Sequence, residues 1–216
     1  MGRLDGKIIL VTGTSRGIGK AVAEAFTAEG AQVVGAARSA GCDVSRETDV
    51  KKLFAGIRKH FGRLDVLINN AGILTPRKSI VEVTTKEWDT TMAANVRSVF
   101  LCTRAALQLM IPKRSGLIIN ISSGAGKRAA PQWGPYAVSK WAVEGFTKSV
   151  AEEVKEFSVN VIAVNPGGTR TAMRAMAYPN EDPQSLKTPE ELAKFFVSLV
   201  AGGVSYHSGD SIEYSS

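Results

Sequence analysis

Short apolar runs alternate along the chain with longer segments in which apolar residues recur every three or four positions. The short runs predict strands at residues 7–12, 32–37, 64–69, 117–122, 159–165 and 211–214. The longer segments predict helices at residues 20–29, 46–61, 85–110, 136–157 and 189–200. This alternation favours an α/β fold in which a doubly wound parallel sheet lies between two layers of helices. We expect one domain over residues 1–216, because no linker, repeat or low-complexity tract interrupts the pattern.

Local signals mark several ends of these elements. Gly30 is expected to end the first helix, while Thr188 caps the last helix and Pro189 occupies its first turn. The least regular stretch, residues 170–187, is predicted to be a loop over a pocket. Ligands of open parallel sheets bind beyond the carboxyl ends of the strands, so polar motifs at those ends are candidate binding residues.

A glycine-rich segment follows the first strand. Gly13, Gly17 and Gly19 have the spacing G-x-x-x-G-x-G and lie between that strand and a helix. Glycines let the chain turn tightly and let a phosphate approach the backbone, and a helix N-terminus adds free N–H groups. We therefore expect a phosphate-binding loop here, although the spacing differs from the common dinucleotide motif G-x-G-x-x-G.

Two later segments add polar residues that can perform chemistry. The strand at 64–69 runs into Asn69-Asn70-Ala71-Gly72, and the strand at 117–122 is followed by Ser123. Tyr136 and Lys140 are spaced i,i+4, so they share one face of a helix. An ammonium beside a phenol favours the phenolate and lowers a tyrosine pKa that is otherwise about 10. Tyr136 is then a usable acid or base, and Ser123 can hold a substrate oxygen.

In their order and spacing, these motifs resemble the short-chain dehydrogenase/reductase family over nearly the whole chain. The resemblance implies a Rossmann-like fold and a catalytic set of Asn95, Ser123, Tyr136 and Lys140. It also implies that Lys140 contacts the nicotinamide ribose and that Asn95 holds a water linking Lys140 to solvent. The residues expected to bind the cofactor are Gly13, Ser15, Arg16, Gly17, Ile18, Gly19, Arg38, Asp43, Val44, Asn70, Ala71, Gly72, Tyr136, Lys140, Pro166, Gly167, Thr169 and Thr171.

Three of the candidate residues have a second interpretation. Asp43 is either an adenine contact or the N-cap of the helix near residue 46. Thr171 either faces the nicotinamide carboxamide or is an ordinary turn residue. Trp133, which precedes the catalytic helix, either packs or contacts substrate.

The end of the second strand favours NADP over NAD. An NAD enzyme of this fold places an acidic residue there to bind the ribose, and the corresponding position here is Ala37. Arg38 follows directly and Arg16 lies in the glycine loop, so two guanidinium groups can bind a 2′-phosphate, with Ser15 adding a hydroxyl. Asp43 is only five residues beyond Arg38 and is the alternative ligand of the ribose, through which the protein would use NAD.

Residues 38–43 depart from the family pattern. The family places a crossover helix and a third strand there, but a crossover between parallel neighbours needs about a dozen residues or more. We therefore expect a six-stranded sheet with the third-strand region shortened and the strand at 32–37 at an edge.

Composition excludes several other classes. Lys and Arg number 27 against 20 Asp and Glu, giving a net charge of +7, but the basic residues are scattered and no nucleic-acid partner is expected. Two cysteines and two histidines supply neither a disulfide framework nor a metal site. Without a signal peptide or an apolar run of ~20 residues, no membrane contact is expected and the cytoplasm is the expected location.

The sequence thus predicts an NADP-dependent oxidoreductase that interconverts a small-molecule carbonyl and an alcohol. The alternative from another class is a non-catalytic dinucleotide-binding protein that senses redox state. Extra apolar residues on the helices at 90–110 and 136–157 predict a homodimer or homotetramer. The residues in question are Val99, Leu101, Leu107, Met110, Val138, Trp141, Phe146 and Val150.

Overall fold

Six parallel strands form a single sheet in the computed structural model, in the order β2-β1-β3-β4-β5-β6. The model describes residues 2–214, so Met1 and residues 215–216, the ends of the expected domain, lie outside the described residues. The strands are β1 (Ile8–Thr12), β2 (Gln32–Ala36), β3 (Val66–Asn69), β4 (Gly116–Ile121), β5 (Val159–Asn165) and β6 (Ser211–Glu213). The predicted six-stranded parallel sheet is confirmed.

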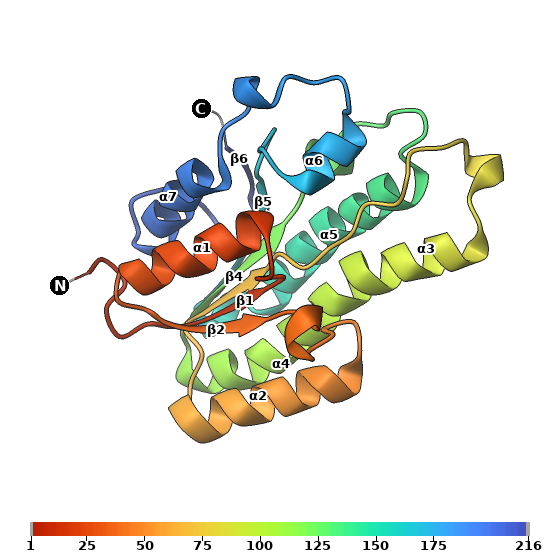
Figure 1. Ribbon diagram of the computed structural model, residues 1–216. Coiled ribbons are helices and arrows are strands. Elements are labelled where there is room, and N and C mark those ends of the chain that lie inside the picture. The colour runs from red at the N-terminus through yellow and green to blue at the C-terminus, as the bar shows by residue number, and fades with distance from the viewer. Residues whose placement is uncertain (1, 215–216) are drawn as a thin grey trace.

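Helices cover both faces of this sheet (Figure 1). On one face, α1 (Gly17–Ala28) packs against α7 (Pro189–Val200), and on the other lie α2 (Glu47–Phe61), α4 (Ser98–Met110) and α5 (Gly134–Glu153). Successive residues of β1 point to opposite faces, with Ile9 in the first core and Leu10 in the second. Both residues are fully buried, which accounts for the continuous apolar runs of the strands.

The connection after β2 is as short as the sequence predicts. A single 3₁₀ turn, Arg38–Ala40, is followed by Gly41, whose φ of 77° reverses the chain. Helix α2 then crosses to β3, which pairs with the other side of β1. Strand β2 is therefore an edge of the sheet.

The helix expected at residues 85–110 has a change of pitch at its middle. It consists of α3 (Thr85–Met92), a π-helical turn over Ala93–Arg97, and α4. Such a π turn widens the helix locally and is frequent at functional sites. Its central residue is Asn95, one of the candidate catalytic residues.

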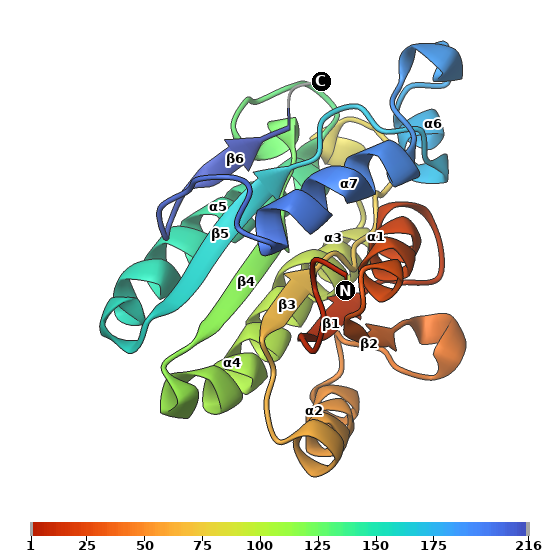
Figure 2. The same cartoon turned by 90° about the vertical axis from the view of Figure 1, so that its left-hand side faces the viewer.

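The segment predicted as a loop, residues 170–187, contains the short helix α6 (Ala172–Ala177) and a 3₁₀ turn, Pro183–Ser185. Arg174 pairs with Glu181 at 2.5 Å, and Arg170 donates to the carbonyls of Pro183 and Leu186, which folds the segment on itself. Figure 2 shows α6 beyond the carboxyl ends of the strands. The predicted cap of α7 is confirmed, since Thr188 accepts a hydrogen bond from the N–H of Glu191.

Within residues 2–214, no helix has both the length and the apolar character needed to cross a membrane. The same residues contain no cluster of three or more His, Cys, Asp or Glu side chains arranged to hold a metal ion.

Candidate active site

A cavity of about 620 Å³ opens at the carboxyl ends of the strands and brings the sequence motifs together. Of the candidate residues, all but Gly19 and Asn95 lie on its wall. The candidates on the wall are Gly13, Ser15, Arg16, Gly17, Ile18, Arg38, Asp43, Val44, Asn70, Ala71, Gly72, Ser123, Tyr136, Lys140, Pro166, Gly167, Thr169 and Thr171.

The glycine loop forms one side of this cavity. Gly13 has a φ of 75°, and a Cβ on it would lie 2.9 Å from the Cα of Ala71. The Asn70 side chain donates to the carbonyl of Thr12 at 2.9 Å and to that of Gly13 at 3.2 Å, which fixes the loop. Helix α1 begins at Gly17 without a side-chain cap, so its first N–H groups point into an open loop suited to a phosphate.

Gly19 has a different role from the one expected. It is buried, and a Cβ on it would lie 2.3 Å from the carbonyl oxygen of Gly13. Gly19 thus allows helix α1 to approach the loop closely and does not form part of the cavity wall.

Thr12 holds the loop from the end of β1, a role that the sequence analysis missed. Its hydroxyl donates to the carbonyl of Ile68 at 3.3 Å and accepts from the N–H groups of Asn70 and Ala71, each at 3.0 Å. A hydroxyl at the end of an otherwise apolar strand was the signal in the sequence.

Ser123, Tyr136 and Lys140 meet at another side of the cavity. Tyr136 is 9% exposed and Lys140 is 7% exposed. Lys140 Nζ donates to the carbonyl of Ile121 at 2.7 Å and lies 5.7 Å from the centre of the Tyr136 ring. Burial lowers the pKa of Lys140 to about 8, and the nearby charge of Glu144 opposes this change.

The prediction that the pKa of Tyr136 is lowered is wrong for the protein without a bound cofactor. Burial raises the pKa of this phenol above its ordinary value, and the hydrogen bond with the Ser123 side chain offsets only part of the change. The ammonium of Lys140 is directed at a backbone carbonyl instead of the phenol oxygen. Desolvation therefore outweighs the effect that the i,i+4 spacing predicts.

Asn95 lies behind the cavity wall and is 1% exposed. Its side chain accepts from the N–H of Ile73 at 2.8 Å and donates to the Ile73 carbonyl at 2.9 Å and to Ser139 Oγ at 3.0 Å. Ser139, which the sequence analysis missed, donates in turn to the carbonyl of Tyr136 at 2.7 Å. The Asn95 side chain thus connects the π turn to the helix that carries Tyr136, and its expected water contact stays a prediction.

The opposite end of the cavity is lined by the shortened connection. Asp43 accepts hydrogen bonds from the N–H and the hydroxyl of Ser45, at 3.0 and 2.7 Å. The N-cap position of α2 is Arg46, which forms no side-chain capping bond, so Asp43 is not the N-cap of α2. Burial alone would raise the pKa of Asp43, but the Ser45 hydrogen bonds and the charges of Arg38 and Arg46 hold it below its ordinary value. The Asp43 carboxylate is consequently charged and lies in the field of Arg38.

The first part of the segment 170–187, from Arg170 to Tyr178, also lines the cavity. Thr171 both caps α6, by accepting from the Arg174 N–H at 3.1 Å, and lies against Gly17 of the glycine loop. Trp133 lines the cavity and also packs, since its ring centre is 5.6 Å from that of Tyr136 and 5.7 Å from that of Tyr178. The sequence analysis missed Tyr178 and Arg174, whose guanidinium lies 3.9 Å from the centre of the Tyr178 ring.

Comparison with known proteins agrees with this geometry. A family model described as short chain dehydrogenase matches residues 7–41 and 35–182, two segments that overlap at the end of β2 and the shortened connection after it. The chain belongs to the short-chain dehydrogenase/reductase family of oxidoreductases.

Individual relatives are similar over most of their length. A protein named 3beta-hydroxysteroid dehydrogenase from Mediterraneibacter gnavus is 41% identical over 193 residues, covering 80% of this chain and 70% of the relative. The uncharacterized oxidoreductase YciK of Escherichia coli K12 is 34% identical over 220 residues, covering 91% and 87%. A crystal structure of a short chain dehydrogenase from Escherichia coli CFT073 complexed with NADPH superposes with a TM-score of 0.90, at 33% identity and 98% coverage of both chains.

Proposed function

We propose that this protein is an NADP-dependent oxidoreductase that interconverts a carbonyl compound and an alcohol. The observation that carries the proposal is the meeting of Ser123, Tyr136 and Lys140 on one cavity wall with the glycine loop on another. NADPH in the similar structure from Escherichia coli CFT073 supports the choice of cofactor class.

The residues present fit a dinucleotide. A Cβ at Gly13 would fill the space beside Ala71, and the uncapped start of α1 offers N–H groups to a pyrophosphate. Arg16 and Arg38 line the same cavity, and the residue directly after β2 is Ala37, where an NAD enzyme of this fold carries a carboxylate. The Asp43 carboxylate also lines this end of the cavity, but one of its oxygens is engaged by Ser45 and the group lies in the field of Arg38. Lys140 and Thr171 would hold the nicotinamide end.

The chemistry divides between the cofactor and three side chains. When bound, the nicotinamide donates a hydride to, or accepts one from, the carbon that carries the substrate oxygen. Tyr136 donates the proton to that oxygen in reduction and accepts it in oxidation. Ser123 donates a hydrogen bond to the same oxygen, and the Lys140 ammonium stabilises the phenolate that Tyr136 becomes. Trp133 and Tyr178 give one side of the cavity an aromatic wall against which a substrate can pack.

A turnover screen tests the proposal. NADPH oxidation is followed with aldehydes, ketones, quinones, 3-oxoacyl thioesters and 3-oxosteroids, the last because one relative bears a hydroxysteroid dehydrogenase name. We expect at least one class to be reduced. Tight NADPH binding without turnover of any class would favour the redox-sensing alternative instead.

A further inference from the structure

Helix α5 carries a buried carboxylate that the mechanism above does not use. Glu144 is 8% exposed and lies one helical turn beyond Lys140. Its Oε1 accepts a hydrogen bond from the hydroxyl of Ser122, just after β4, and another from the hydroxyl of Ser211, in β6, at 2.9 Å. A buried charge is costly unless it is paired or hydrogen-bonded, so this one calls for an explanation.

The contacts of Glu144 complete a set of links between α5 and three consecutive residues at the end of β4. The carbonyl of Ile121 accepts from Lys140, the hydroxyl of Ser122 donates to Glu144, and the side chain of Ser123 bonds to Tyr136. Because the three residues are consecutive, the middle link restricts the orientation of the same segment that carries the two outer links. The two outer links belong to the candidate catalytic set.

Glu144 also provides a negative charge near the buried ammonium of Lys140, whose other neighbours in the described part of the chain are uncharged. Helix α5 presents Tyr136 and Glu144 to Lys140, β4 presents the Ile121 carbonyl, and the turn Gly124–Gly126 presents backbone. Lys127, just beyond that turn, bonds to the Ser211 carbonyl at 3.3 Å and is exposed. Burial lowers the pKa of Lys140 to about 8, and among the described residues Glu144 is the one carboxylate whose charge raises it.

We propose that Glu144 is a positioning residue that orients residues 121–123 against α5 and keeps Lys140 in its charged form. The assignment of Lys140 to the cofactor rests on the proposed function, but the charge of Lys140 can be measured without it. Loss of the carboxylate leaves a buried ammonium without its opposite charge, and such an ammonium deprotonates more easily.

The direct test is a proton titration of Lys140 by NMR in protein labelled with ¹³C-lysine. The Lys140 resonance is identified by its loss in Lys140→Arg. Glu144→Gln keeps an oxygen that accepts from a serine and removes the charge, and we expect it to lower the pKa of Lys140 by about one unit or more. An unchanged Lys140 pKa in a folded Glu144→Gln protein overturns the proposal.

Matched variants separate charge from structure. Glu152→Gln neutralises an exposed carboxylate on the same helix, paired with Lys155 at 3.5 Å, and should leave the Lys140 titration unchanged. Ser211→Ala removes one hydrogen bond but keeps the Glu144 charge, and should also leave it unchanged. If Glu144→Gln does not fold, Glu144→Asp is used, and its shorter side chain should lower the Lys140 pKa by a smaller amount.

A second readout distinguishes failure of this proposal from failure of the proposed function. NADPH affinity is measured by fluorescence at pH values on both sides of 8. We expect the Glu144→Gln protein to lose affinity at a lower pH than the unmodified protein. A lowered Lys140 pKa without NADPH binding by the unmodified protein refutes the cofactor assignment and leaves the positioning role intact. If the unmodified protein binds NADPH but the Lys140 pKa is unchanged in Glu144→Gln, the positioning role is refuted and the cofactor assignment is kept.

Discussion

At the scale of single residues, the phenol of Tyr136 is where the proposed reaction exchanges its proton. Replacement of Tyr136 by Phe removes the hydroxyl and leaves the ring against Trp133. We expect kcat to fall at least ~100-fold, the lower range for loss of a general acid, with little change in NADPH affinity. Steady-state kinetics with a substrate from the screen measures this.

Tyr206→Phe is the matched control for that experiment, since Tyr206 packs against the core beneath α1 and α7, away from the cavity. It should retain near-normal turnover. A Tyr136→Phe protein with comparable kcat would mean that another group supplies the proton.

The two arginines near the end of β2 determine the expected cofactor preference. We expect kcat/KM for NADPH to exceed that for NADH at least ~10-fold, which corresponds to ~1.4 kcal/mol. Arg38→Ala and Arg16→Ala should each reduce kcat/KM for NADPH and leave that for NADH nearly unchanged. Arg58→Ala, on the exposed side of α2, is the control and should change neither value. Equal use of both cofactors by the unmodified protein would contradict the assignment.

The sequence predicted most of the cavity wall because each motif follows directly after a strand. In a parallel sheet such positions meet at one edge, so their order along the chain is enough to place them together. It did not predict that Gly19 faces the loop or that Asn95 faces Ile73, because those orientations depend on the rotation of helices in three dimensions. The pKa of Tyr136 was missed for a similar reason, since the spacing of Lys140 says nothing about burial.

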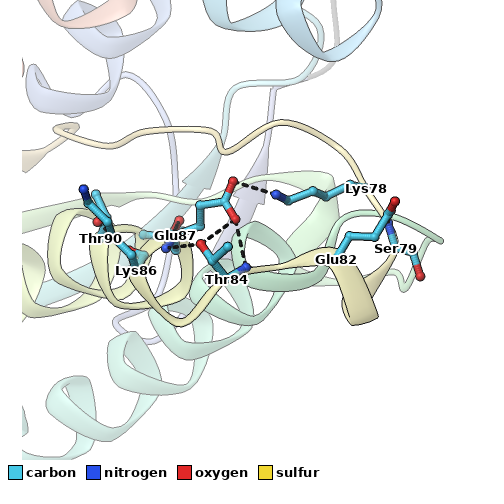
Figure 3. A network of polar contacts seen from close by, with 8 residues as sticks. Lys78, Ser79, Glu82, Thr84, Lys86, Glu87 and Thr90 are labelled. Atoms are coloured by element: carbon cyan, nitrogen blue, oxygen red, sulfur yellow. Dashed lines mark hydrogen bonds and ion pairs between the residues drawn. The ribbon is translucent and has the colours of Figure 1, made fainter.

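At the scale of elements, helix α3 begins with a polar network that holds the start of the helix leading to Asn95 (Figure 3). Glu87 accepts hydrogen bonds from the Thr84 N–H and hydroxyl, at 2.9 and 2.8 Å, and pairs with Lys78 at 2.7 Å. The Thr84 hydroxyl accepts from the Glu87 N–H, completing a capping box. The Lys78 bond, followed by those of Thr84, lowers the pKa of Glu87 to about 2.

This network predicts a pH-dependent contribution to stability. Because the folded-state pKa of Glu87 lies below its ordinary value of 4.5, the contribution is full above that value and is lost as the pH falls toward about 2. Glu87→Gln should therefore lower the melting temperature at neutral pH. The difference in melting temperature between the variant and the unmodified protein should decrease as the pH falls from 4.5 toward about 2. Asp89→Asn, an exposed change on the same helix, should show no such trend, and a difference independent of pH would contradict the prediction.

Element boundaries were predictable where a characteristic residue type marks them. Thr188 and Pro189 marked the start of α7, and Gly30, with a φ of 89°, follows the end of α1. The π turn at Asn95 and the helix α6 were not predicted. The π turn inserts one extra residue per turn without a distinctive residue type. Helix α6 has only six residues, too few for a helical apolar pattern to show in the sequence.

At the scale of the whole molecule, α4 and α5 leave apolar side chains uncovered. Val138 is 43% exposed, Trp141 is 52% exposed and Phe100, which the sequence analysis did not select, is 41% exposed. Four residues expected at an interface instead lie in the core of the protomer. These are Val99, Leu101, Met110 and Val150. Leu101, Met110 and Val150 belong to the core between the sheet and the helices α2, α4 and α5, so their apolar character serves folding.

We therefore expect association through the exposed set. Trp141→Glu should convert the assembly to monomers at micromolar concentration, as measured by light scattering, because it places a charge in an apolar contact. Val81→Glu, at an apolar position 87% exposed near α3, is the control and should leave the molar mass unchanged. A monomeric unmodified protein would refute the expectation.

The short turn after β2 is a site where additional residues can be inserted. The free side of β2 carries unpaired backbone groups, and Gly41 lies in a turn where an added side chain would meet nothing within 4 Å. A strand and helix inserted at this turn can pair with β2 without breaking any hydrogen bond of the existing sheet. A single insertion at this turn would therefore extend the sheet to seven strands without rearrangement of the remaining fold.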